Sequence, residues 1–299
     1  MQRVLLTAMF AAAASSAFAQ QAEAPVREIV QVEGDLYRFQ DNQHFGVFLV
    51  TDEGIVVADP LNRGAAEWLA SELDARFDVP VQYVVYTHHH GDHASGAAVW
   101  PEATVVAHAD AKAALTPPAA GTPEYEAFQE EFGEGSQYGG TRAPDETFAG
   151  AQHSINLGGE TVTLVHVGGN HASDMSLILF PEHDTLFAAD IISGRRLAFM
   201  NMPGFDPADQ QAMVDAALAQ DFEHFVPGHG DMGGRADVEA YGQYFRDLLA
   251  GVQAGIDAGQ SLEEIQQTLL LEDYADWGAY DIWRAGNIEG AHRYLTSES

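Results

Sequence analysis

A dense cluster of potential metal ligands, His88-His89-His90-Gly91-Asp92-His93, constrains this chain more than any other stretch of its sequence. It reads as His-x-His-x-Asp-His, which puts four potential ligands within six residues. Imidazole and carboxylate together suit zinc and related divalent ions, and a cluster with both ligand types can supply two neighbouring sites. A solvated polar loop is the alternative, but a run this dense in histidine has few other uses. The cluster therefore predicts a metal centre.

The residues around the cluster predict its place in the fold. Val81–Thr87 is an apolar, β-branched and aromatic run after Pro80, which is typical of a buried strand. Further potential ligands also stand where an apolar run ends: His171 after 161–167, Asp190 after 185–189 and His229 after 222–226. Glycines near these positions let the backbone turn sharply and leave room for an ion and its water. So many ligands can hold two ions with open positions, which marks a catalytic rather than a structural site.

Strand and helix signals follow one another twice along the chain and predict an α/β fold. The first half has strand signals at 28–32, 36–39, 45–51, 54–58, 81–87 and 104–108, and helical signals from 62 or 63 to 77 and at 94–100. The second half has strand signals at 154–157, 161–167, 175–180, 185–189 and 222–226, and helical signals at 207–220, 237–252 and 262–270. This order favours two similar halves packed face to face.

The stretch 109–147 has a looser pattern, with Pro117-Pro118, Gly139-Gly140 and an acidic and aromatic piece between them. A long excursion within a compact domain usually has a functional role or is disordered. Because it comes directly after the strand that follows the cluster, we expect a lid insertion at about 109–147. Residues 274–295 predict a closing helix on the core, so the C-terminal portion is expected to be helical.

The N-terminus has the pattern of a secretory signal peptide. It starts with Met1-Gln2-Arg3, continues through an apolar run at 4–14 and reaches the Ala-x-Ala site Ala17-Phe18-Ala19. Residues 1–19 are therefore expected to be a cleaved signal peptide, with 20–299 a single domain in the periplasm or outside the cell. The apolar run is too short for a membrane anchor, which needs roughly 20 apolar residues. The chain has no cysteine, so disulfides cannot stabilise the fold.

The charge of the chain restricts its partners. There are 45 acidic and 13 basic residues, which gives a formal net charge of −32. Nucleic acids and anionic membranes attract basic proteins, so we expect neither as a partner. Because 46% of the residues are hydrophobic, the charge indicates a solvating surface rather than a disordered chain. A small-molecule substrate is the expected partner, and the oligomeric state is not predicted.

These motifs resemble those of the metallo-β-lactamase superfamily in type and in order, and the resemblance covers nearly all of the mature chain. It implies a four-layer αβ/βα sandwich with two zinc ions at its edge, although iron or manganese also stays open. The ligands implied for the first ion are His88, His90 and His171, those for the second are Asp92, His93 and His229, and Asp190 bridges the two. Asp59, which follows a strand, is implied to support the cluster's loop from behind.

The resemblance and the ligand set imply an exported zinc-dependent hydrolase. Coordination lowers the pKa of bound water to about 7, so a metal-bound hydroxide is expected to attack a small cyclic or activated acyl bond. Asp92 is expected to orient this hydroxide and to take or return a proton, while the metals hold the oxyanion and the leaving group. A β-lactam amide is the substrate that we expect first, ahead of lactones and thioesters.

Alternatives stay open at this point. True β-lactamase branches typically have Cys or Ser at the position of Asp190, whereas a bridging Asp is similar to the glyoxalase II, lactonase and phosphodiesterase branches. A lactone or thioester hydrolase is therefore an alternative, and so is a periplasmic metal-binding module without turnover. Iron redox chemistry, as in flavodiiron proteins, is disfavoured because those proteins prefer a carboxylate at the position of His90 and no flavin domain follows here.

Arg195 and Arg196 follow Asp190 within one loop and are candidate contacts for a substrate carboxylate. Their alternative role is to pair with surface carboxylates. His89 is expected to point away from the metals. The other histidines, whose spacing does not suit a ligand, are expected to be core or surface side chains: His44, His108, His153, His166, His183, His224 and His292. His44 is kept in reserve because the superfamily places a mobile loop over the substrate at that point.

Overall fold

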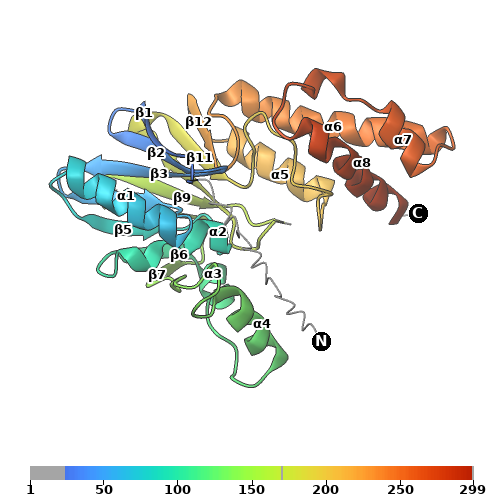
Figure 1. Cartoon of the computed structure of the whole chain (residues 1–299). Coiled ribbons are helices and arrows are strands. Elements are labelled where there is room, and N and C mark those ends of the chain that lie inside the picture. The colour runs from blue at the N-terminus through green and yellow to red at the C-terminus, as the bar shows by residue number, and fades with distance from the viewer. Residues whose placement is uncertain (1–23, 170, 298–299) are drawn as a thin grey trace, which may run out of the picture.

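The computed structural model describes residues 24–169 and 171–297, and its strands form two sheets (Figure 1). The seven-stranded sheet has the order β1-β2-β3-β4-β5-β6-β7, and the five-stranded sheet has the order β12-β11-β10-β9-β8. The first sheet contains β1 (Arg27–Glu33), β2 (Leu36–Asp41), β3 (His44–Thr51), β4 (Gly54–Ala58), β5 (Val81–Val85), β6 (Thr104–His108) and β7 (Glu146–Phe148). The second contains β8 (Gln152–Leu157), β9 (Glu160–His166), β10 (Ser176–Phe180), β11 (Thr185–Ala189) and β12 (His224–Pro227).

Each sheet changes from antiparallel to parallel pairing along its order. Strands β1 to β4 pair antiparallel and β4 to β7 pair parallel, while β8 to β11 pair antiparallel and β11 pairs parallel with β12. The carboxyl ends of parallel strands lie at one edge of a sheet, which is where α/β proteins place their ligands. Both sheets therefore offer an edge at which loops from several strands can meet.

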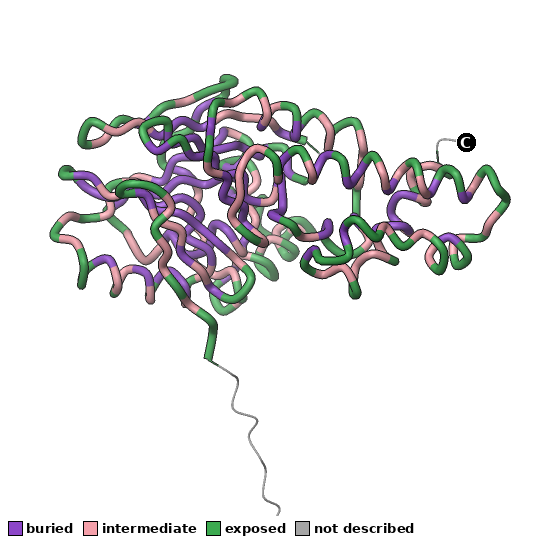
Figure 2. Tube along the Cα trace, turned by 90° about the horizontal axis from the view of Figure 1, so that it is seen from above, coloured by how far each residue is buried: buried purple, intermediate pink, exposed green. Residues whose placement is uncertain are grey.

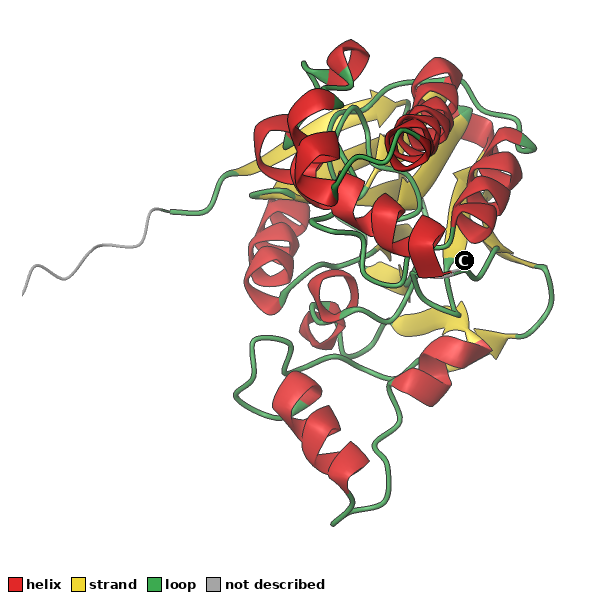
Figure 3. Ribbon diagram, turned by 90° about the vertical axis from the view of Figure 1, so that its right-hand side faces the viewer, coloured by secondary structure: helices red, strands yellow, loops and turns green. Residues whose placement is uncertain are grey.

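Helices cover the outer face of each sheet, and Figure 3 shows them gathered around the strands. On the first sheet lie α1 (Arg63–Arg76), α2 (Gly91–Ala94) and α3 (Ala109–Ala114). On the second lie α5 (Pro207–Leu218) and α6 (Arg235–Asp257), followed by α7 (Leu262–Thr268) and α8 (Tyr280–Ser297). Helix α4 (Pro123–Phe132) has no buried residue and projects from the body in Figure 1. None of the helices in the described part of the chain is long and apolar enough to cross a bilayer.

The core lies between the two sheets and beneath the helices, as the buried segments in Figure 2 show. One cluster of buried side chains joins the facing surfaces of the two sheets, with Val47, Val56 and Val85 from the first and Leu164 and Phe187 from the second. Separate clusters lie under α1 and under α5 and α6. Burying apolar surface on both faces of each sheet requires the helix, sheet, sheet, helix order. The predicted four-layer αβ/βα sandwich is confirmed.

Two local predictions differ from the structure. The helix predicted at 94–100 is not one helix, because α2 ends at Ala94 and a separate 3-10 turn covers Ala97–Val99. Helix α2 also begins earlier than predicted, at Gly91, where the backbone N–H groups of His93 and Ala94 both donate to the carbonyl of His90. Asp92 and His93 therefore lie in a helical turn rather than in a loop. The stretch 109–147 is not loose but contains α3, α4 and β7. The predicted signal peptide at 1–19 lies outside the described residues, and the single domain and the lid stay predictions.

Candidate metal centre

Loops from both sheets bring the predicted ligands together at one edge of the sandwich. The cluster His88–His93 follows β5, whereas His171 follows β9 and Asp190 follows β11 directly. His229 comes just after β12, which pairs parallel with β11. Because β5 and β12 are sequence-distant and belong to different sheets, only the packed sandwich assembles this set of side chains.

The ligands form two groups that share Asp190. In the first, ligand atoms of His88, His90, His171 and Asp190 all lie within 4.8 Å of one another. Within it, His171 Nε2 is 3.3 Å from His88 Nε2 and 3.4 Å from an Asp190 carboxylate oxygen. Imidazole nitrogens that face each other at this distance are arranged to share an ion.

The second group contains Asp92, His93, His229 and Asp190, again within 4.8 Å. Asp190 Oδ1 lies 3.1 Å from His93 Nε2 and 3.2 Å from His229 Nε2. Both His93 Nε2 and Asp190 Oδ1 are buried and lack a well-directed hydrogen bond among the described residues. Buried polar atoms are rarely left without a partner, so this pair is explained by an ion between them. The donor set fits two divalent ions.

Hydrogen bonds behind the ligands turn three imidazoles toward the centre. The Thr87 hydroxyl donates to Asp59 Oδ2 at 2.6 Å, so its oxygen accepts from His88 Nδ1 at 3.0 Å. His93 Nδ1 donates to the same Asp59 oxygen at 3.0 Å, and His229 Nδ1 donates to the Gln43 carbonyl at 2.7 Å. In each ring Nε2 is then the atom that faces the centre, which is how outer partners orient metal-binding histidines.

Asp59 occupies the supporting position that was predicted for it. It is fully buried, has a positive φ of 51°, and also accepts the backbone N–H of Thr87 at 2.8 Å. Burial raises the pKa of Asp59, and its hydrogen bonds with His93 and Thr87 work against that shift. The structure thus ties the end of β4 to the first residues of the cluster.

The two groups differ in the charge of their histidines. Burial, followed by the charge on neighbouring histidines, lowers the pKa of His88 well below its usual range, and it lowers that of His90 to about 4. For His93, burial opposes a charged ring, but Asp190 and Asp59 outweigh it and hold its pKa well above the usual range. The first group therefore offers neutral imidazoles, and in the second His93 carries a proton until an ion replaces it.

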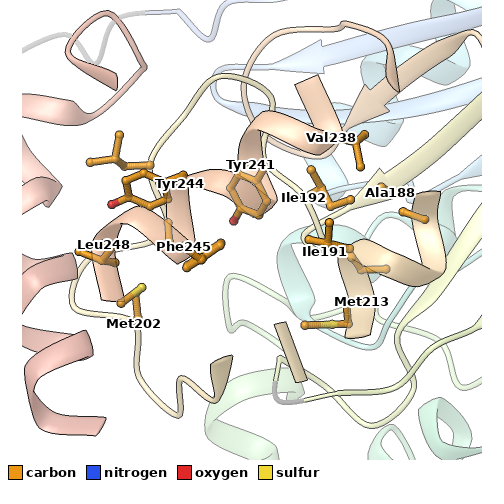
Figure 4. Packing of buried hydrophobic residues seen from close by; sticks show 14 of the residues in the cluster. Ala188, Ile191, Ile192, Met202, Met213, Val238, Tyr241, Tyr244, Phe245 and Leu248 are labelled. Atoms are coloured by element: carbon orange, nitrogen blue, oxygen red, sulfur yellow. The ribbon is translucent and has the colours of Figure 1, made fainter. Parts of the chain in front are cut away.

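A cavity of about 600 Å³ opens over both groups. One wall carries the ligands Asp92, His171, Asp190 and His229. Other parts of the lining come from α5, α6 and the loop after β11, where Figure 4 shows the cluster that contains Tyr241, Phe245, Met202 and Met213. Tyr138, from the predicted lid segment, also lines the cavity. The space suits a small molecule with an apolar portion.

The structure separates the two candidate substrate contacts. Arg196 lines the cavity, is partly buried, and stacks on the Trp283 ring with 4.5 Å from guanidinium carbon to ring centroid. Arg195 is exposed, forms an ion pair with Asp276 and does not line the cavity. Only Arg196 can therefore contact a molecule in this cavity.

His44 is a site residue that the sequence did not reveal. It lines the cavity, and its Nε2 lies 3.4 Å from Asp92 Oδ2. It belongs to no ligand motif and starts a strand far from the cluster, so only its place between two strands kept it in reserve. His89 points away from both groups and contacts Asp174 at 2.8 Å, as expected.

A further group, His108, Asp110 and His166, also comes within 4.8 Å, although its spacing in the sequence gave no sign of it. The two histidine rings stack face to face, with centroids 3.7 Å apart and planes 3° apart. The in-plane lone pairs of parallel rings run side by side rather than converging on one ion. His166 Nε2 also donates to the Ser173 carbonyl at 2.8 Å, so this group is kept apart from the metal centre.

Comparison with known proteins gives the family. A family model described as the metallo-beta-lactamase superfamily matches residues 41–229, which contain all the ligands above. A solved structure, "Metallo-beta-lactamase from Pontibacter korlensis", is similar with a TM-score of 0.58 and 19% identity, over 73% of this chain and 98% of that chain. At this identity the likeness shows the fold alone, and no curated protein matches the chain. Because the family model covers more than half of the sequence, the chain belongs to the metallo-β-lactamase superfamily.

Proposed function

We propose that this chain is an exported dinuclear zinc hydrolase that cleaves a small cyclic or activated acyl bond, with a β-lactam amide as the first named substrate. The observation that carries the proposal is the sharing of Asp190 by two ligand groups beneath one cavity. Ligands of both groups line that cavity, so water and a substrate could reach both ions, as a catalytic site requires. Periplasmic or secreted location belongs to the same proposal and rests on the N-terminal sequence.

The chain's own residues would divide the chemistry between them. When bound, two divalent ions supply Lewis acidity toward a carbonyl oxygen and lower the pKa of water to about 7. Burial opposes ionisation of Asp92, but its contact with His44 and the charge of His93 outweigh burial and lower its pKa to about 2. Asp92 is therefore an anion at the cavity wall at neutral pH, where it can orient the attacking water by accepting a hydrogen bond from it.

Arg196 and the apolar lining would orient the substrate. Its guanidinium forms no ion pair with any described carboxylate, although acidic residues far outnumber basic ones in this chain. A half-buried cation that stacks on an aromatic ring and has no carboxylate in ion-pair distance among the described residues favours an anionic group on the substrate. Phe199, Met202 and Phe205 line the same cavity and would contact an apolar arm. A small acid with such an arm is the class of substrate that fits.

A lactone or thioester is the second candidate, and Asp190 is the observation that favours it. A bridging carboxylate at this position resembles the glyoxalase II and lactonase branches rather than the dedicated β-lactamases. The attack on the carbonyl and the roles of Asp92 and Arg196 would be the same. The candidates therefore differ in the leaving group, an amide nitrogen against an oxygen or a sulfur.

Turnover of three substrates tests the proposal. Nitrocefin, an acyl-homoserine lactone and a glutathione thioester are assayed with the wild-type chain, with Asp92→Asn and after treatment with EDTA. We expect metal-dependent turnover of at least one, lowered about 100-fold or more in Asp92→Asn, because the substitution removes the anion that orients the attacking water and misplaced reacting groups cost roughly that much. His153→Asn is the control, since His153 pairs with Glu146 away from the cavity lining. Turnover unchanged by EDTA, or binding of metal with no turnover of any of the three, would contradict the proposal.

A further inference from the structure

The tip of the β2–β3 hairpin touches the second ligand group through three consecutive residues. The Gln43 carbonyl accepts from His229 Nδ1 at 2.7 Å. His44 Nε2 lies 3.4 Å from Asp92 Oδ2. The Phe45 backbone N–H donates to the carbonyl of Gly228 at 2.9 Å. One short segment thus supports both Asp92 and the loop that carries His229.

His44 sits among the ligands of the second group. Its ring centroid is 4.9 Å from that of His229 and 6.5 Å from that of His93, with interplanar angles of 69° and 65°. The side chain is 34% exposed, on the cavity side of the hairpin. Its ring and ion-pair contacts among the described residues are with Asp92, His93 and His229, so its influence falls on the second group.

The hairpin tip is held in place by contacts behind it. Asn42 donates its backbone N–H to the Val26 carbonyl at 2.8 Å and accepts the Val26 N–H on its side chain at 3.0 Å. Asp41 accepts from Arg27 at 2.7 Å and from Asn62 at 2.7 Å. These bonds fix the turn without help from any ligand, so His44 is positioned before an ion arrives.

We propose that His44 is a positioning residue that orients the Asp92 carboxylate and thereby sets the affinity of the second metal position. His44 Nε2 lies 3.4 Å from Asp92 Oδ2, the oxygen that also lies 3.8 Å from His93 Nε2, so this contact can hold the carboxylate in a rotation that turns Oδ2 toward the second group. Losing such an outer partner typically weakens metal binding about 10–100-fold. The inference rests on the dinuclear centre of the proposed function but not on any substrate.

Stepwise zinc binding tests this role. The metal-free chain is titrated with zinc against a chromophoric chelator, in the wild type and in His44→Phe, His44→Gln and His153→Phe. His44→Phe keeps an aromatic ring without the donor, and it is expected to weaken the second ion about 10–100-fold while the first stays near the wild type. His44→Gln returns an N–H donor and is expected to recover most of the loss. His153→Phe, which replaces a histidine outside the cavity, is expected to bind both ions like the wild type.

The outcomes separate positioning from damage to the fold. Unchanged affinities in His44→Phe, or equal weakening of both ions, would overturn the inference, and so would a His44→Gln variant as weak as His44→Phe. A wild-type chain that takes up a single ion would overturn it together with the dinuclear centre. Failure of the hydrolase proposal looks different, because two ions would then bind as described while every substrate remained intact.

Discussion

At the scale of single residues, proton binding distinguishes the two metal positions. His88 and His90 have lowered pKa values and are neutral at pH 7, whereas the raised pKa of His93 keeps it protonated there in the metal-free chain. A metal ion requires the neutral ring, so it must displace a proton from His93. On acidification, protons should displace the ion at the second position first. The pKa of His90 is about 4, so this ring binds a proton only at lower pH and the first position keeps its ion longer.

We therefore expect the first zinc ion to release almost no proton at pH 7 and the second to release about one. Calorimetric titrations in two buffers with different ionisation enthalpies measure this release. Acid titration of the loaded chain should remove the second ion at a higher pH than the first. Equal proton release by both ions, or loss of the first ion before the second, would contradict the charge assignment.

The role of Arg196 in substrate binding can be tested with Arg195 as the matched control. Replacing Arg196 by Gln should raise KM for an anionic substrate about 10–100-fold and leave kcat within a few-fold, because a hydrogen bond to a charged group contributes about 1.5–3 kcal/mol. Arg195→Gln removes the same charge from the adjacent residue, which pairs with Asp276 outside the cavity, and should leave KM unchanged. Equal effects of the two substitutions would mean that overall charge, rather than contact, attracts the substrate.

The residues of the site were predictable to the extent that they carry a motif. The spacing of the cluster and the strand ends before His171, Asp190 and His229 indicated the ligands, and the structure brings these side chains together. The sequence could not show which of Arg195 and Arg196 lines the cavity, because the positive φ of 45° at Arg195 directs the two side chains to different environments. His44 has no motif, since its role comes from strand pairing that sets the hairpin beside Asp92.

At the scale of elements, the predicted lid segment is joined to the centre by an aromatic contact. Tyr138 lines the cavity and packs on Gly91, where an added Cβ would meet its ring at 2.1 Å. Rings do not yield to such an overlap without moving as a whole. Gly91→Ala should therefore displace Tyr138 and loosen residues 116–141, which include α4 and Tyr138.

Hydrogen–deuterium exchange measures this loosening. We expect faster exchange at 116–141 in Gly91→Ala than in the wild type, with the strands unchanged. Gly150→Ala is the control, because an added Cβ there meets only the Gln152 carbonyl, at 3.9 Å, and the backbone is not in the left-handed region. Exchange at 116–141 equal to that of the wild type would show that the contact does not hold the segment.

Helix α4 was not predicted from the sequence. It has no buried residue, so it has no buried apolar face whose periodicity could indicate a helix. Local signals were present, because Thr122 caps the N-terminus through Tyr125 N–H at 3.2 Å and Pro123 takes the first helical position. By contrast, α1 was predicted nearly in full from Ala65, Ala66, Leu69 and Leu73, which are buried against the sheet.

At the scale of the whole molecule, the strand pattern predicts the sandwich. The net charge of the chain predicts repulsion between carboxylates at its surface. A formal charge of −32 means that folding brings many carboxylates close together. Salt screens repulsion between exposed charges, with a Debye length that falls from about 30 Å at 0.01 M to about 3 Å at 1 M. The unfolding temperature should therefore rise by several degrees between these concentrations of sodium chloride. A midpoint that falls with salt would contradict net self-repulsion.

The proposed metal centre requires two ions that share Asp190. The most direct test is a crystal structure of the zinc-loaded chain with anomalous data collected on both sides of the zinc absorption edge. We predict two anomalous peaks, with the first among His88, His90 and His171, the second among Asp92, His93 and His229, and Asp190 in contact with both. A single peak, or two peaks of which only one touches Asp190, would contradict the dinuclear centre.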